Sequence, residues 1–281
     1  MSSRRDALKT LATLAAAGLL PRAARSMSWS AESIKYIGVQ LYTVRAAMGK
    51  DVAATLKAVA KLGYREVEFA GYFGHSPADI RRMLDDNGLA APSCHLSLDD
   101  LRQRFDATAE AAHTVGHKYL TVAWLDARER KTLDDWKKLA DAFNEAGRRA
   151  KGAGLRLAYH NHEEEYLPVD GRVPMEILIS GTDPALVAHE MDLFWIWKAG
   201  IDPRTYFARF PGRFEMVHVK DSKGAPGHVM TEVGSGTMDW KGIFAHSRQA
   251  GIKHYFVEHD DPVDPMGSIR LSFDYLKALR F

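Results

Sequence analysis

Eight short apolar runs, whose starts lie about 30 residues apart beyond residue 30, constrain the fold of this chain more than any other feature. The runs are 37–41, 66–69, 93–96, 119–123, 155–160, 187–191, 214–219 and 255–258. Between them lie segments with the periodicity of amphipathic helices, at 51–62, 77–87, 99–115, 134–151, 203–210 and 240–250. This spacing is the length of one strand with its return helix. The sequence therefore predicts eight strand-helix units.

Eight such units predict an α/β chain that folds as a single (β/α)8 barrel over residues 27–281. A doubly wound open sheet is the alternative, and it is disfavoured because no glycine-rich phosphate-binding turn follows the first run. No Pro- or Ser-rich linker divides the chain. With 46% apolar and 26% charged residues the chain has the composition of one well-buried domain, and its lone cysteine, Cys94, excludes a disulfide framework.

Residues 1–26 have the pattern of a twin-arginine (Tat) signal peptide. Arg4 and Arg5 precede a modestly apolar stretch at 11–20, and residues 24–26 offer a small-x-small cleavage site. A membrane span needs roughly 20 strongly apolar residues, so we expect no stable membrane anchor. We expect the Tat export machinery as a partner, and the periplasm as the location of the mature domain.

The charge balance argues against nucleic acid as a partner. The chain has 38 Lys and Arg against 36 Asp and Glu, and residues 1–26 hold five of the basic residues but one acid, which leaves a mature charge of about −2. Phosphate neutralisation needs clustered Lys and Arg. We therefore expect a small-molecule ligand and no nucleic acid, and we leave the choice between monomer and homo-oligomer open.

Titratable side chains recur where the apolar runs end, which is where the chemistry of a (β/α)8 barrel lies. Asp192, His218 and Glu258 follow three successive runs. Mixed histidine and carboxylate ligands suit Mn²⁺, Zn²⁺, Fe²⁺ or Co²⁺ better than Ca²⁺, which prefers oxygen ligands. The three residues therefore predict a site for one divalent ion.

The fifth run ends in two histidines and three glutamates. His160 and His162 share one face of a strand, because strand side chains alternate, so both can point into the barrel mouth. We expect His160 to be a metal ligand or to lie beside one. Glu165 either belongs to a solvated acidic turn or folds back over the site, and we favour the second interpretation.

Other features have simpler interpretations. Trp195 either packs in the barrel or offers its ring to a sugar. The segment 234–237 predicts a tight loop beside the mouth, with Asp239 capping a helix that begins at Trp240. We expect four histidines to lie on the surface: His113, His117, His246 and His254.

At these residues the chain resembles the xylose isomerase-like TIM barrel superfamily, in the group called sugar phosphate isomerases/epimerases. The resemblance covers roughly residues 34 to 280. The segments that carry it are 38–45, 67–71, 159–162 with 165–166, 191–195 with 199–200, 218–221, 234–236 with 239–240, and 257–260.

The resemblance implies one divalent ion held by Asp192, His218 and Glu258, with His160 standing where many relatives carry a glutamate. We expect Mn²⁺, with Co²⁺, Mg²⁺, Zn²⁺ and Fe²⁺ as alternatives. It also implies removal of a proton next to a carbonyl through a metal-stabilised enediolate. The expected catalytic residues are Glu258, Lys220, His162 and Glu165, and the expected substrate-binding residues are Glu68, His95 and Trp195.

The expected function is therefore a sugar isomerase or epimerase that acts on an unphosphorylated sugar or keto-sugar. A lyase or hydratase on keto-sugars or 3-keto-glycosides is the alternative, because His160 replaces one of the two glutamates that two-base epimerases of this group use. A non-catalytic periplasmic sugar-binding barrel is the alternative of another class. Such a module has no need for Asp192, His218 and Glu258 to converge.

Overall fold

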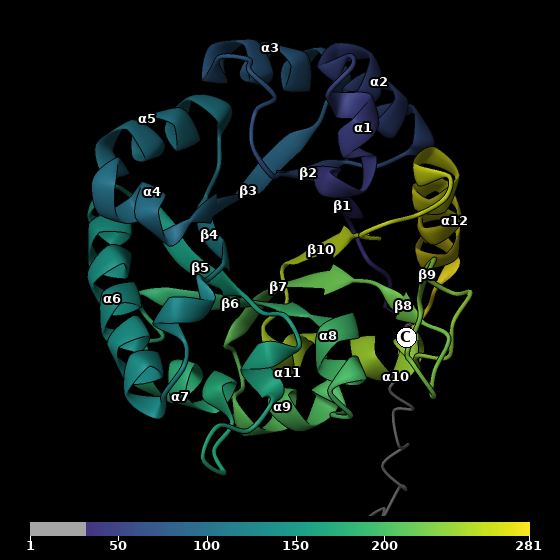
Figure 1. The fold of residues 1–281 in the computed structure, drawn as a ribbon. Coiled ribbons are helices and arrows are strands. Elements are labelled where there is room, and N and C mark those ends of the chain that lie inside the picture. Colours follow the sequence, from purple (N-terminus) through teal and green to yellow (C-terminus); the bar gives the residue numbers. More distant parts are fainter. Residues whose placement is uncertain (1–31) are drawn as a thin grey trace, which may run out of the picture. The chain divides into compact units, whose positions relative to one another are not determined.

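A computed structural model describes residues 32–281, and the expected signal peptide at 1–26 lies outside this range. The described chain contains a closed barrel of parallel strands in the order β1-β10-β7-β6-β5-β4-β3-β2 (Figure 1). The predicted (β/α)8 barrel is confirmed, and the open-sheet alternative is wrong. The barrel strands are β1 (Gly38–Gln40), β2 (Glu66–Phe69), β3 (Ala90–Ser97), β4 (Tyr119–Trp124), β5 (Arg156–His160), β6 (Val187–Asp192), β7 (Phe214–Val219) and β10 (His254–Val257).

Helices form a ring around the barrel (Figure 1). They are α1 (Arg45–Met48), α2 (Val52–Leu62), α3 (Pro77–Asn87), α4 (Leu98–Gln103), α5 (Phe105–Val115), α6 (Leu133–Gly152), α7 (Pro174–Gly181), α8 (Leu193–Lys198), α9 (Pro203–Arg209), α10 (Trp240–Phe244), α11 (Ser247–Ala250) and α12 (Pro265–Ala278). Short 3-10 turns occur at η1 (Leu41–Val44), η2 (Ala127–Glu129) and η3 (Glu164–Tyr166). No helix among residues 32–281 is both long and apolar enough to cross a membrane.

The helix predictions differ from the structure in two ways. The predicted helix at 99–115 is divided at Arg104 into α4 and α5, and the one at 240–250 is divided into α10 and α11. The helical periodicity did not single out α7, α8 or α12. Two of these, α7 and α8, have eight and six residues, so they are too short for a periodic pattern to stand out.

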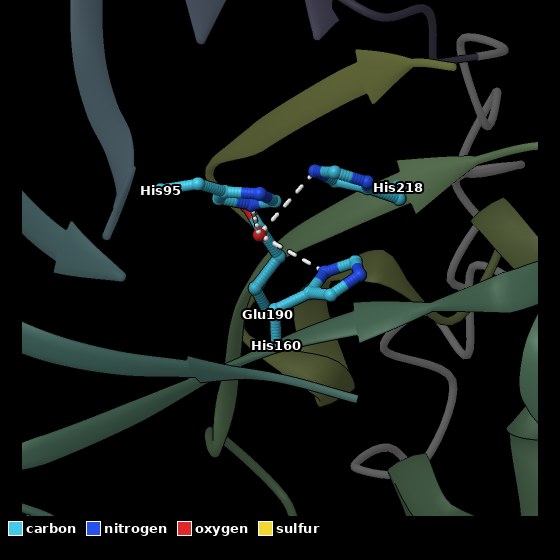
Figure 2. Close-up of side chains that lie close together, drawn as sticks. All are labelled: His95, His160, Glu190 and His218. Atoms are coloured by element: carbon cyan, nitrogen blue, oxygen red, sulfur yellow. Dashed lines mark hydrogen bonds and ion pairs between the residues drawn. The ribbon is translucent and has the colours of Figure 1, made fainter. Parts of the chain in front are cut away.

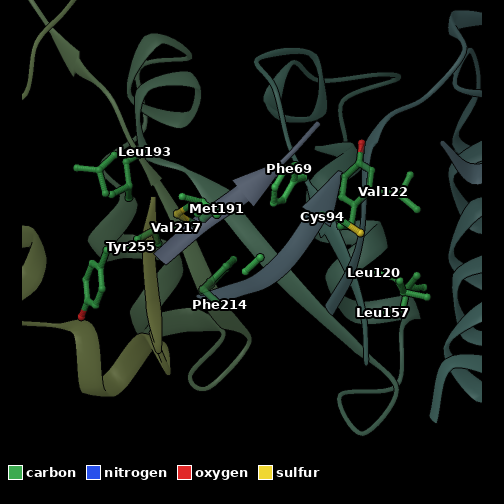
Figure 3. Close-up of a cluster of buried hydrophobic side chains, with 14 of the residues drawn as sticks. Phe69, Cys94, Leu120, Val122, Leu157, Met191, Leu193, Phe214, Val217 and Tyr255 are labelled. Atoms are coloured by element: carbon green, nitrogen blue, oxygen red, sulfur yellow. The ribbon is translucent and has the colours of Figure 1, made fainter. Parts of the chain in front are cut away.

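The outward face of the strands packs under the helices. Figure 3 shows part of this layer, including Phe69, Leu120, Leu157 and Met191, and these four side chains are fully buried. Helices cover the outside of the barrel, so the outward side chains of the strands are as apolar as those of a protein core. For this reason each strand appears in the sequence as a run of apolar residues.

Towards the amino end of the barrel, beside the pair of Glu66 and His254, a group of inward side chains forms an apolar floor. A buried cluster of Tyr119, Ala158, Ala188, Met216 and Phe256 fills this end. Gly38 leaves room for Phe256, since a Cβ at this position would lie 2.6 Å from a ring carbon of Phe256. The floor separates the next inward layer from solvent on that side.

A loop after β7 is organised by one buried carboxylate, that of Asp221. The segment starts with a two-stranded ribbon, β8 (Asp221–Ser222) with β9 (Met230–Thr231). The carboxylate of Asp221 accepts hydrogen bonds from the backbone N–H groups of Ser222, Gly234, Gly236 and Met238 and from Trp240 Nε1. The predicted tight loop at 234–237 is confirmed, and Asp239 caps α10 as expected.

We expect Asp221→Ala to destabilise the fold by about 3 kcal/mol, because it removes a buried acceptor and leaves several donors unpaired. Urea unfolding followed by circular dichroism measures this loss. Asp261→Ala is the matched control, since the Asp261 side chain is 97% exposed and its loss stays within roughly 0.5 kcal/mol. Equal stability of the two variants would contradict the role given to Asp221.

The expectation that four histidines lie on the surface is wrong for His117, which is 4% exposed, and for His254, whose side chain is 14% exposed and lies 2.8 Å from Glu66 Oε2. His117 Nδ1 lies 2.6 Å from the carbonyl oxygen of Ala91, and Nε2 lies 2.9 Å from the hydroxyl of Tyr72. Burial lowers the pKa of His117 to about 4. His117 lies just before β4, and α3 and β3 cover it. The sequence around His117 does not show this cover, because it forms only when the chain folds.

A lowered folded-state pKa means that His117 binds its proton more readily in the unfolded chain. The contribution of neutral His117 to the free energy of unfolding is complete above pH 6.5 and is lost as the pH falls from there towards 4. We expect a loss of about 3 kcal/mol over that range, measured by urea unfolding at each pH. His117→Gln removes this part of the pH dependence and makes the slope shallower, whereas the exposed His113→Gln leaves the slope unchanged. If the free energy of unfolding of His117→Gln fell with pH as steeply as that of the wild type, a group other than His117 would be responsible.

Candidate metal centre and active site

Above the apolar floor, the next inward positions are polar and largely buried. Seven of the eight barrel strands, or the residue directly after them, contribute one side chain each: Gln40, Glu68, His95, His160, Glu190, His218 and Glu258. Buried charges are costly unless they pair with opposite charges or donors. The contacts within this layer show how each charge is paired.

Glu190 on β6 lies at the centre of three imidazole rings (Figure 2). Its Oε2 atom is 2.8 Å from His95 Nε2, 3.1 Å from His160 Nδ1 and 3.3 Å from His218 Nε2. Burial favours the neutral acid, but the positive His218 and the imidazole hydrogen bonds hold the pKa of Glu190 well below its usual range. Glu190 is therefore a buried carboxylate that orients three rings.

His218 on β7 lies between two further carboxylates. Its Nε2 atom is 2.7 Å from Glu68 Oε2, and its Nδ1 atom is 2.7 Å from Glu258 Oε2. Burial opposes protonation of the ring, but Glu190 and Glu258 outweigh it and raise the pKa of His218 well above its usual range. Gln40, the register partner of Glu68 on β1, donates a 2.8 Å hydrogen bond from Nε2 to Glu68 Oε2.

Lys220 lies one layer nearer the mouth and contacts three carboxylates. Its Nζ atom is 2.9 Å from Asp192 Oδ2, 2.7 Å from Glu258 Oε2 and 2.7 Å from Asp260 Oδ1. Burial lowers the pKa of Lys220, but Asp192 and Glu258 more than offset this and raise it. For Asp192 burial outweighs Lys220, so the pKa rises to about 6.

Two groups of donor atoms each converge closely enough for a divalent ion, and both include His218. One is Asp192, His218 and Glu258, and the other is His95, His160, Glu190 and His218; in each group the donor atoms lie within 4.8 Å of one another. Asp192 Oδ2 is buried, and the Lys220 ammonium 2.9 Å away is the cation paired with it. Imidazole nitrogens with carboxylate oxygens fit ions such as Mn²⁺, Fe²⁺, Co²⁺ and Zn²⁺.

The orientation of the rings favours the first group, with His160 added to it. His160 directs Nδ1 at Glu190, and its Nε2 atom lies 3.8 Å from Asp192 Oδ2. His218 directs Nε2 at Glu68 and Nδ1 at Glu258. In metal sites one imidazole nitrogen binds the ion while the other donates to a carboxylate. Asp192, His160, His218 and Glu258 are therefore suited to hold an ion, and Glu68 and Glu190 are suited to orient the histidines.

A cavity of about 250 Å³ opens above this layer. Of the expected substrate contacts, His95 lines it, whereas Glu68 is fully buried beneath the histidines. Of the expected catalytic residues, His162, Lys220 and Glu258 all line it. Burial and the nearby Lys220 lower the pKa of His162 to about 4, so its imidazole is neutral at pH 7.

Besides Glu68, the expected ligands Asp192 and His218 lie below this cavity rather than in its lining, and Glu165 and Trp195 lie away from it. Glu165 is buried, and its oxygens accept hydrogen bonds from Tyr159 Oη and from the backbone N–H of His162, at 2.8 and 2.7 Å. Burial raises the pKa of Glu165. These contacts hold the turn that carries His162. Glu165 and Trp195 line a neighbouring cavity instead.

Glu190 and Asp260 are members of this layer and its mouth that the sequence interpretation did not select. Glu190 lies two positions before Asp192, so the alternation of strand side chains places both inside the barrel. Asp260 likewise lies two positions after Glu258 and faces Lys220. The period of two is the signal that could have identified Glu190, whereas Asp260 lies beyond the end of β10 and is placed by the folded loop.

A family model described as the xylose isomerase-like TIM barrel matches residues 56–279 of this chain. The inosose dehydratase of Lacticaseibacillus casei is 23% identical over 248 residues, which cover 75% of this chain and 83% of that protein. That of Geobacillus kaustophilus is 27% identical over 188 residues, covering 59% of this chain and 60% of that protein.

A sugar phosphate isomerase/epimerase from Parabacteroides distasonis has the same fold, with a TM-score of 0.78 and 28% identity over 88% of this chain and 99% of that chain. The match of the family model extends over most of the described barrel, including the strands that carry Glu68, His160, Asp192 and His218. This chain belongs to the xylose isomerase-like TIM barrel family.

Proposed function

We propose that this chain is a divalent-metal-dependent enzyme that removes the proton next to the carbonyl of an unphosphorylated sugar or keto-sugar, and returns it to give an isomer or epimer. The observation that carries the proposal is the convergence of Asp192, His218 and Glu258 below a cavity of about 250 Å³ that Lys220 and His162 also line. A volume below the roughly 300–1,000 Å³ of sites for drug-sized ligands suits a single sugar ring.

The charges around the cavity favour an unphosphorylated substrate. Phosphate groups are bound by clustered Arg and Lys with free charge. Lys220, the lysine that lines this cavity, is already paired with three carboxylates. Glu258 and Asp260 add negative charge at the same place.

The side chains can divide the proton chemistry between them. Burial raises the pKa of Glu258, but Lys220 and His218 outweigh it, so the pKa is low and the carboxylate is ionised and able to accept a proton. Lys220 can donate to a substrate oxygen on which negative charge develops. Neutral His162 lines the same cavity from the segment after β5. A bound divalent ion supplies Lewis-acid stabilisation of that negative charge.

A dehydratase or lyase is the second candidate. The carboxylates that line the cavity, Glu258 and Asp260, both follow β10, and the side chains from β3 and β5 are histidines. Proton return on the opposite face needs a second acid, whereas elimination needs a donor to the departing oxygen, which Lys220 or His162 can provide. The two curated relatives named above are called inosose dehydratases, which supports this candidate.

We expect one divalent ion per chain, removable by a chelator. His218→Gln and Glu258→Gln each remove a ligand at similar side-chain volume, so both lose the ion, while His113→Gln on the surface keeps it. At an ion concentration of 100 Kd the wild-type free energy of unfolding rises by about 2.7 kcal/mol, and that of the two ligand variants does not. Elemental analysis and thermal unfolding measure both effects. Full ion content in both ligand variants would place the ion elsewhere.

The ion-loaded protein should exchange the proton next to the carbonyl of a bound keto-sugar for deuterium in D₂O. Proton NMR over a panel of keto-sugars measures the exchange, and Glu258→Gln slows it by at least about 10²-fold, because the proton acceptor and a ligand of the ion are lost together. Asp261→Asn, an exposed carboxylate nearby, is the control. Exchange with isomer formation supports the first candidate and exchange with elimination the second. Binding without exchange contradicts both and favours a non-catalytic sugar-binding barrel.

A further inference from the structure

A second cavity of about 410 Å³ adjoins the one above Glu258. It lies among the last residue of β4 and the segments that follow β4, β5 and β6. Trp124, Arg130, His162, Glu163, Trp195 and Lys198 line it. His162 lines both cavities, so it marks the place where they meet. Together the two cavities fall within the roughly 300–1,000 Å³ of a larger ligand site, whereas the first alone does not.

Each cavity has an exposed aromatic ring in its lining. Among residues 32–281, Tyr36, Tyr42 and Trp124 are the aromatic side chains with large exposure, at 48%, 43% and 59%. Tyr42 lines the first cavity and Trp124 the second, whereas Tyr36 precedes β1 at the opposite end of the barrel. An exposed indole beside a cavity offers an apolar face to the C–H face of a sugar ring.

The second cavity also has polar groups in need of partners. Arg130 Nε and Trp195 Nε1 are buried donors without a hydrogen-bond partner in the described chain. Buried donors normally have partners, and ligand hydroxyl oxygens can supply them. The Lys198 ammonium lies 4.8 Å from the centre of the Trp195 ring, so this indole contributes its N–H rather than a free face.

Both cations that line the second cavity are paired with carboxylates, and a third carboxylate, Glu165, lies 3.9 Å from Arg130. Lys198 Nζ lies 2.8 Å from Glu163 Oε2, and Arg130 lies 3.6 Å from Glu164 Oε1. Such pairing favours an uncharged ligand over a phosphate or a carboxylate. An uncharged ligand that uses both an aromatic face and several polar groups is a polyol ring rather than an apolar aromatic group.

We propose that the second cavity is a subsite for a second sugar ring, so that the substrate is a disaccharide or longer glycoside. The reacting ring then lies above Glu258, the next ring lies against Trp124, and His162 lies beside the bond that joins them. The identity of the reacting ring rests on the proposed function, but binding of the second ring does not depend on turnover.

The test compares binding of glucose with that of its disaccharides maltose, cellobiose, trehalose and laminaribiose by the ion-loaded protein, using isothermal titration calorimetry and saturation-transfer NMR. We expect at least one disaccharide to bind roughly tenfold or more tightly than glucose. Trp124→Ala removes this advantage, Trp124→Tyr retains most of it, and Tyr36→Ala, an exposed ring at the other end of the barrel, leaves it unchanged.

The absence of any disaccharide advantage in the wild type overturns the proposal, as does an advantage that survives Trp124→Ala. The proton exchange in D₂O described above separates this proposal from the proposed function. A disaccharide advantage that depends on Trp124, without exchange on any keto-sugar, keeps the subsite and rejects the enzyme. Exchange with no disaccharide advantage keeps the enzyme and rejects the subsite.

Discussion

The burial of four carboxylates inside one end of the barrel is the constraint on which the rest of this structure depends. Glu68, Glu190 and Asp192 are fully buried, and Glu258 is 6% exposed. Each loses hydration worth several kcal/mol, which only paired cations and hydrogen-bond donors can offset. Three histidines and Lys220 supply this pairing. The layer is therefore interdependent, because loss of one partner leaves a buried charge unpaired.

The same pairing prepares the site for chemistry. Glu190 and Glu68 each take one nitrogen of a histidine, so the other nitrogens of His160 and His218 face Asp192 and Glu258. These contacts fix the orientations of the rings, and preorganised groups need little rearrangement during a reaction. Lys220 lies between Asp192 and Glu258 and also contacts Asp260. An ion held by the first two carboxylates would therefore still leave Lys220 a partner.

The barrel strands and the segments that follow them carry different parts of the site. Strand ends hold the polar layer, whereas the exposed last residue of β4, Trp124, and the segments after β4, β5 and β6 form the second cavity. Proteins with this barrel are named as dehydratases and as isomerases/epimerases, so the fold does not decide the reaction. In the subsite that we propose, residues on these segments would select the molecule that binds above the polar layer.

The spacing of apolar runs determined the strand count and the barrel by itself, because a strand with its return helix is a local pattern. That pattern also placed Asp192, His218 and Glu258 at one end of the barrel. Closure of the barrel decided the rest: Glu68 meets His218 across 150 residues of sequence, and Glu165 meets Tyr159 only once η3 has formed. The alternation of side chains along a strand determines which of them point into the barrel. Which side chains of other strands they contact depends on how all eight strands close the barrel.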